Sequence, residues 1–137
     1  MFFTIWYGIY NRRTGELTYA SGGHPPALLL TDTSTGKTEF APLRAPNKVI
    51  GGMPKATYER RRCKVGDRNT LYIFSDGVYE VERTDDSMWR FQEFSDFMTK
   101  SKTGDQSRLD HLYSYAKNLG NLQNFVDNFM ILEVAYA

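Results

Sequence analysis

The sequence predicts a single α+β domain with largely antiparallel sheets, and three observations lead to that class. The chain has 137 residues, which suits one domain and is long enough to build a hydrophobic core. Short runs rich in aromatic and β-branched residues fill the first half of the chain. Two segments with helical periodicity come late. Strands first and helices afterwards are typical of the α+β class.

The expected strands follow one another with polar, glycine-containing or proline-containing breaks between them. The strands before the helices are expected at residues 2–10, 17–21, 27–32, within 33–40, and at 57–65 and 71–74. The breaks include "NRRTGE", "GGHPP" and a long segment rich in proline and glycine, because paired glycines and prolines cannot continue a ladder. An apolar strand at residues 125–137 is expected to close the domain.

Two helices are expected between the last two strands. Phe91, Phe94 and Met98 recur at i, i+3 and i+7 within the segment 87–100. The segment 106–120 repeats leucine, tyrosine and alanine at helical spacing and ends at a glycine. Both segments therefore present one apolar stripe that can pack on a sheet.

Composition excludes several classes of function. Seventeen basic and sixteen acidic side chains give a formal charge of +1, so no global field indicates nucleic acid or an anionic membrane as a partner. No apolar run approaches the roughly 18 residues that a membrane span needs. One cysteine, Cys63, excludes an internal disulfide and fits a reducing cytoplasm, the expected location. We interpret Cys63 as a packed side chain and not as a nucleophile.

Two acidic residues stand where apolar strands end or begin. Asp76 follows the run "LYIF", and Asp127 lies near the start of the closing strand. If these strands are antiparallel neighbours, both carboxylates lie at one sheet edge, about 5 Å of strand spacing apart. Two such acids favour a divalent cation, and Gly77 would let the backbone approach a ligand. The alternative is two turn acids that bind nothing.

The order of these segments resembles a known family. "YGIYNRRTGELTYASGGHPPALLL", "VGDRNTLYIFSDGVYEVER", two helices and "VDNFMILEV" together resemble the C-terminal part of the SpoIIE/RsbU-like bacterial phosphatases. These are metal-dependent (PPM, type 2C) serine/threonine protein phosphatases. The resemblance covers essentially the whole chain. It implies part of an αββα sandwich with two Mg²⁺ or Mn²⁺ ions between the sheets, and hydrolysis of phosphoserine or phosphothreonine by a metal-activated water.

Carried over by position, the resemblance assigns Asp76 and Asp127 to one metal, with no catalytic residue beyond the metal ligands. His24 of "GGHPP" is expected to order its loop. The family's upstream Asp and Gly-His-Gly block has no counterpart here, so residues 1–137 are expected to be one truncated domain with ligands for at most part of one metal. This chain alone is expected to be inactive or weakly active.

The resemblance also implies partners. A phosphorylated regulatory protein, such as an anti-sigma-factor antagonist, is the expected substrate, and an upstream sensory or receiver domain is the expected neighbour. An incomplete sandwich exposes apolar sheet surface, so self-association of the chain is expected.

Two departures from the family pattern keep an alternative function open. Met130 stands where the last block usually has threonine, and Gln92 stands where glycine usually follows phenylalanine. A non-catalytic or degenerate phosphatase-like interaction module is therefore the alternative. The basic run "ERRRCK" is interpreted as a solvated edge strand, with a role in binding substrate phosphate as its alternative.

Overall fold

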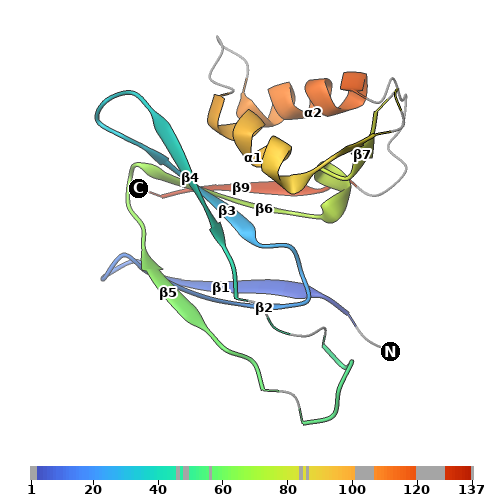
Figure 1. Ribbon diagram of the computed structural model, residues 1–137. Coiled ribbons are helices and arrows are strands. Elements are labelled where there is room, and N and C mark those ends of the chain that lie inside the picture. Colours follow the sequence, from blue (N-terminus) through green and yellow to red (C-terminus); the bar gives the residue numbers. More distant parts are fainter. Residues whose placement is uncertain are drawn as a thin grey trace.

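The chain folds into three layers, with two helices on a four-stranded sheet and a three-stranded sheet beneath it (Figure 1). The computed structural model describes residues 3–45, 47, 50–55, 57–83, 85, 87–100, 107–119 and 129–136. Within these residues the helices cover one face of the four-stranded sheet, and no described helix covers the outer face of the three-stranded sheet.

The three-stranded sheet begins the chain and is antiparallel throughout. Its spatial order is β1 (Ile5–Asn11), β2 (Glu16–Gly22) and β5 (Arg61–Lys64). A tight loop joins β1 to β2, and its Gly15 has a φ of 73°, a conformation that side chains with a Cβ rarely adopt. The strands predicted at 2–10, 17–21 and 57–65 thus form, and the last of them is the shortest of the three.

The four-stranded sheet holds the strands that position the candidate site. Its order is β4 (Thr38–Leu43), β3 (Ala27–Asp32), β6 (Asn69–Phe74) and β9 (Ile131–Ala135), and all neighbours are antiparallel. Pro42 is accommodated because β4 lies at the edge, where a missing N–H breaks no ladder. β3 has four buried residues in succession because both of its faces are covered.

Alternation along β3 divides the interior into two cores. Leu28 and Leu30 point toward the helices and join a cluster with Tyr72, Phe94 and Leu112. The intervening side chains join a second cluster between the two sheets, which includes Ala27, Leu29, Trp6, Leu17 and Leu71. One strand therefore holds both cores together.

The helices are α1 (Phe91–Lys100) and α2 (Arg108–Leu119), and a short hairpin precedes them. The hairpin pairs β7 (Val81–Glu82) with β8 (Met88–Trp89). The helix predicted at 87–100 therefore starts at Phe91, because the two residues of β8 are extended and pair with β7. Ser87 belongs to the hairpin turn, where its hydroxyl donates to an Asp85 carboxylate oxygen.

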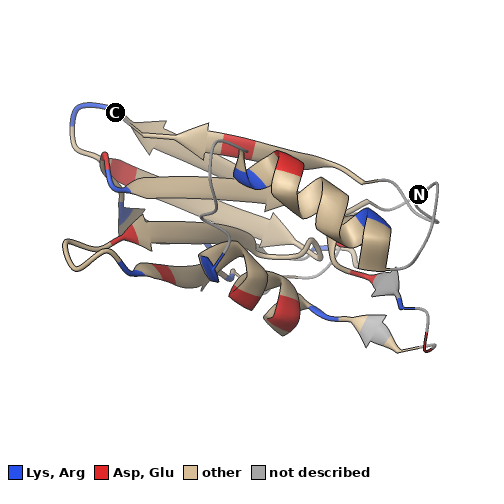
Figure 2. Ribbon diagram, turned by 90° about the horizontal axis from the view of Figure 1, so that it is seen from above, with Lys and Arg blue, Asp and Glu red and all other residues tan. Residues whose placement is uncertain are grey.

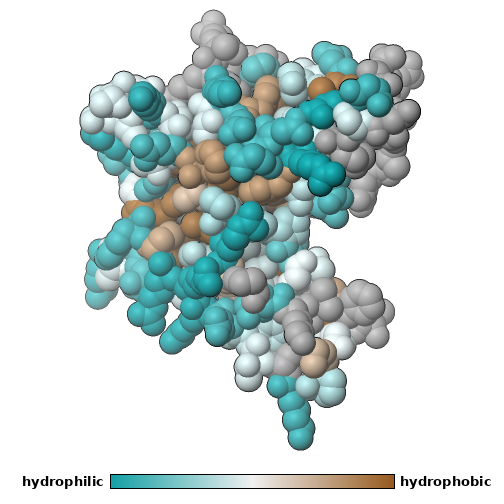
Figure 3. All heavy atoms as spheres, viewed as in Figure 1, coloured by the Kyte–Doolittle hydropathy of each residue, from teal (hydrophilic) through white to brown (hydrophobic). Residues whose placement is uncertain are grey.

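Figure 2 shows basic and acidic residues on both the sheets and the helices. Figure 3 shows a band of hydrophobic side chains between the helical layer and the lower sheet. No helix formed by the described residues is long and apolar enough to cross a membrane.

Candidate functional site

Asp76 stands at the point where the central strand β6 ends. The run that precedes it is buried at Leu71, Tyr72 and Phe74. A single 3₁₀ turn over Asp76–Val78 follows, and its Gly77 and Val78 are buried while Asp76 is exposed. The Asp76 carbonyl accepts the Tyr79 and Glu80 N–H groups at 3.1 and 2.9 Å. The backbone of the turn is thus satisfied internally, and the carboxylate faces outward.

Ser75 joins this turn to the start of β9. Its N–H donates to the Met130 carbonyl at 2.9 Å, and its hydroxyl oxygen accepts the Met130 N–H at 3.1 Å. Phe74 pairs with Ile131 in the antiparallel register of β6 and β9. The two strands are therefore antiparallel neighbours, which is the condition that the sequence left open.

Asp127, the second predicted ligand, lies outside the described residues. Its role and that of Asp76 therefore stay predictions. In sequence, Asp127 is three positions before Met130, the residue that contacts Ser75.

His24 occupies the same sheet edge, in the loop before β3. Its Nδ1 lies 2.9 Å from the Pro25 carbonyl, so that nitrogen carries the proton and donates. The Ser21 hydroxyl donates to the His24 carbonyl at 3.0 Å, and the Gly23 N–H donates to the Asn47 carbonyl at 3.0 Å. These contacts support the predicted role of His24 in ordering the loop, which stays a prediction.

Two hollows lie at this edge and share His24. A groove of about 740 Å³ runs past Ser75, Met130 and Tyr113 to His24. A smaller hollow of about 120 Å³ is also lined by His24, together with Arg44. Asp76 lines neither hollow, and its neighbour Ser75 lines the groove.

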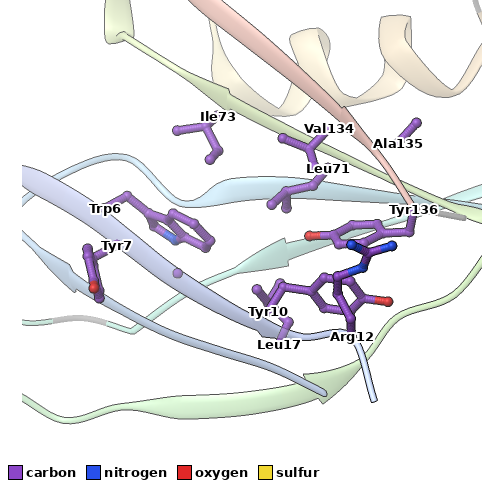
Figure 4. Close-up of a pocket in the computed structure, with 11 residues that line it drawn as sticks. Trp6, Tyr7, Tyr10, Arg12, Leu17, Leu71, Ile73, Val134, Ala135 and Tyr136 are labelled. Carbon is purple, nitrogen blue, oxygen red and sulfur yellow. The ribbon is translucent and has the colours of Figure 1, made fainter. Parts of the chain in front are cut away.

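A further cavity of about 580 Å³ lies between the two sheets (Figure 4). Trp6 and Tyr10 of β1 point toward Leu71 and Tyr136 of the upper layer, and the Tyr10 and Tyr136 rings meet edge to face at 4.7 Å. Asp76 does not line this cavity. It is mainly aromatic and aliphatic, so the candidate site lies elsewhere.

The donor set decides what the edge could hold. Among the described residues there is no group of three or more His, Cys, Asp or Glu side chains placed to hold a metal ion. Asp76 alone supplies one carboxylate, whereas Mg²⁺ and Mn²⁺ take about six oxygen ligands. The residues present fit a contribution to a cation site and not a complete one.

The remaining residues singled out by the sequence have ordinary environments. Gln92 is the second residue of α1, and its amide donates to the Asp96 carboxylate at 3.2 Å. Arg62 of the basic run faces Glu16 at 4.0 Å with both side chains solvated, as expected of an edge strand. Burial raises the pKa of the Cys63 thiol, which disfavours a reactive thiolate.

Solved structures similar to this chain are phosphatase domains. The SiaA-PP2C domain of Pseudomonas aeruginosa has a TM-score of 0.75 at 14% identity, covering 98% of this chain and 51% of that chain. The phosphatase domain of the cell fate determinant SpoIIE from Bacillus subtilis, Mn presoaked, has a TM-score of 0.69 at 17% identity, covering 97% and 56%. The fold is therefore that of PP2C-type phosphatase domains, which confirms the predicted fold class.

Sequence comparison identifies the family. The chain matches Stage II sporulation protein E (SpoIIE) over residues 1–134 and belongs to that family. It is 31% identical over 80 residues to phosphoserine phosphatase RsbU of Bacillus subtilis, covering 58% of this chain and 23% of that protein. It is 23% identical over 110 residues to protein IcfG of Synechocystis sp., and the match covers 80% of this chain and 17% of that protein. The chain spans about half the length of the solved domains and less than a quarter of these two relatives.

Proposed function

We propose that this chain is the part of a SpoIIE-family serine/threonine protein phosphatase that contributes Asp76 to the metal centre. The exposed carboxylate of Asp76, at the end of a buried strand and beside the start of β9, carries this proposal. Membership of the SpoIIE family supports the same activity. The substrate class is phosphoserine or phosphothreonine on a regulatory protein.

Asp76 and Asp127 would hold Mg²⁺ or Mn²⁺ together with ligands from elsewhere in the complete domain. When bound, such an ion lowers the pKa of a coordinated water and offsets the charge of the phosphate. The chain itself fixes the carboxylate, because the Ser75 contacts with Met130 set where the Asp76 turn begins. Gly77 is buried in the turn that follows the carboxylate.

The proposal includes the wider setting of the chain. An anti-sigma-factor antagonist is the kind of phosphorylated regulator we propose as substrate, with a sensory or receiver domain preceding the phosphatase domain. The reducing cytoplasm is the proposed location, which the single free Cys63 supports. We expect residues 1–137 on their own to have little or no activity, because the part of the chain that the structure describes brings no complete set of metal ligands together.

The test uses the whole natural polypeptide that carries this sequence, with Mn²⁺ and a phosphoserine peptide. Asp76→Asn should reduce kcat/KM by at least about a hundredfold, since an amide replaces an anionic ligand. Asp67→Asn is the matched control, because Asp67 is exposed in the turn before the same strand, at its opposite end. Turnover by Asp76→Asn at the wild-type rate would contradict the proposed role of Asp76, whereas no turnover by the wild-type polypeptide would favour the non-catalytic module.

A further inference from the structure

We infer that Arg44 binds the phosphate of the substrate, from the sheet edge that also carries Asp76. The inference rests on the proposed function and deepens it, because it names a residue that selects phosphorylated groups. The basic run of β5 is the sequence's alternative for that role, and Arg62 of that run instead faces Glu16 on the other sheet.

The topology places Arg44 at the Asp76 edge. β4 and β6 both pair antiparallel with β3, so they run in the same direction and end at the same side of the sheet. Leu28 is opposite Pro42 on one side and Tyr72 on the other, and Arg44 and Asp76 both lie just beyond the ends of these strands. With strands about 4.8 Å apart, Arg44 lies about 10 Å across the sheet from Phe74, the residue of β6 level with it, and Asp76 follows Phe74 by two residues.

The Arg44 guanidinium contacts the aromatic cluster that packs against the Asp76 turn. The Arg44 guanidinium carbon lies 5.4 Å from the centre of the Phe91 ring. The Phe91 ring centre lies 6.1 Å from that of Phe74, which precedes the Asp76 turn, and 5.5 Å from that of Tyr79, which follows it. Arg44 therefore lies over the same aromatic cluster that supports the turn.

The charge of Arg44 is available to a ligand. Arg44 is exposed, and the ion pairs within the described residues join Arg62 to Glu16 and Arg83 to Glu93. No described carboxylate therefore neutralises Arg44. The hollow beside it is lined by neutral or weakly basic groups, among them His24 and Asn47. A guanidinium suits phosphate because its planar fork donates two parallel N–H bonds to two oxygens.

The kinetic test uses the whole natural polypeptide with Mn²⁺ and p-nitrophenyl phosphate, and inorganic phosphate as inhibitor. Arg44→Gln should raise both the KM and the inhibition constant of phosphate about tenfold or more, with a smaller change in kcat, because a charge-assisted pair to phosphate is lost. Arg44→Lys should give intermediate values of both constants, since lysine keeps the positive charge and lacks the two parallel N–H donors of the guanidinium. Arg68→Gln, exposed at the opposite end of β6, is the matched control.

A second measurement separates this inference from the proposed function. Calorimetric titration of the Mg²⁺-loaded polypeptide with inorganic phosphate needs no turnover, and Arg44→Gln should weaken phosphate binding by a similar factor. Equal phosphate affinity in Arg44→Gln and Arg68→Gln would overturn the inference, leaving Arg44 as a packing contact of Phe91. In the kinetic assay, loss of turnover by Asp76→Asn tests the proposed function separately, whatever phosphate affinity the Arg44 variants have.

Discussion

Gly8 is an exposed strand residue whose missing side chain makes room for a core tryptophan. An added Cβ would lie 2.8 Å from two atoms of the Trp6 ring, closer than van der Waals contact allows. Trp6 is buried, stacks on Tyr19 at 5.8 Å and donates its ring N–H to the Leu43 carbonyl at 3.4 Å. To make room for an added methyl group, the ring would have to give up its stacking on Tyr19 and its hydrogen bond to Leu43.

We predict that Gly8→Ala lowers the free energy of unfolding by about 1–3 kcal/mol, the usual cost of overpacking a core. Chemical denaturation followed by tryptophan fluorescence measures this change. Gly66→Ala is the control, because nothing lies within 4 Å of its added Cβ. Equal stability of the two variants would show that Trp6 repacks freely.

At the scale of elements, a partly buried polar network ties α2 to the sheet. The Tyr72 hydroxyl donates to a Glu133 carboxylate oxygen of β9 at 2.6 Å, and Arg108 of α2 donates to the same hydroxyl at 3.4 Å. Burial, followed by the hydrogen bond to Glu133, raises the pKa of Tyr72 to about 12, against the opposing influence of Arg108.

This shift makes a prediction about alkaline stability. A folded-state pKa above the unfolded value of about 10 gives stability that is complete below pH 10 and is lost as the pH rises toward 12. Tyr72 should account for about 3 kcal/mol of that loss, at 1.36 kcal/mol per pKa unit. Urea denaturation between pH 9 and pH 12 should therefore show a shallower decline for Tyr72→Phe than for the exposed control Tyr7→Phe. Parallel curves would contradict the prediction.

Elements were predicted correctly from the sequence where a short stretch of neighbouring residues determines them. The strand at 27–32 has the predicted bounds, because an apolar run between two breaks is a local pattern. The hairpin of β7 and β8 escaped prediction because strands of two residues carry no periodicity. The helical pattern of the sequence therefore predicts Trp89 as part of the first helix, whereas it lies in β8 and its ring packs on Phe94 and Phe97 of α1.

The same distinction applies to the candidate site. Asp76 could be found from the sequence, because an acid directly after a buried apolar run breaks the local pattern. Arg44 could not be predicted as a site residue, because its place at the same end of the sheet as Asp76 depends on β4 and β6 both pairing with β3. Strand neighbours that are distant in sequence leave no signal in a single sequence.

At the scale of the whole molecule, the two sheets share an exposed apolar side. β1 and β9 are edge strands of their sheets, and the cavity between the sheets is lined by both. Tyr7 and Ile9 of β1 are 58% and 57% exposed, and Leu132 of β9 is 58% exposed. Edge strands of soluble proteins usually carry charges that prevent pairing with other chains, and apolar side chains occupy these exposed positions instead.

We therefore predict that the 137-residue chain self-associates at high concentration. Light scattering should give a mass above 15.8 kDa that falls toward this value on dilution. Ile9→Lys combined with Leu132→Lys should favour the monomer, because each places a charge on an exposed edge strand. Ala41→Lys, on the opposite edge strand β4, is the control. A wild-type monomer at every concentration would contradict the prediction.

The exposure of Asp76 and Arg44 has a consequence for how this domain can change over evolutionary time. Neither side chain belongs to either core cluster, so losing one removes chemistry while leaving the packing of the sandwich intact. With the roles proposed for Asp76 and Arg44, single substitutions could therefore convert such a domain into an inert binding module at little cost in stability. Good packing in a relative would then say nothing about its activity, and the identities of the edge residues would.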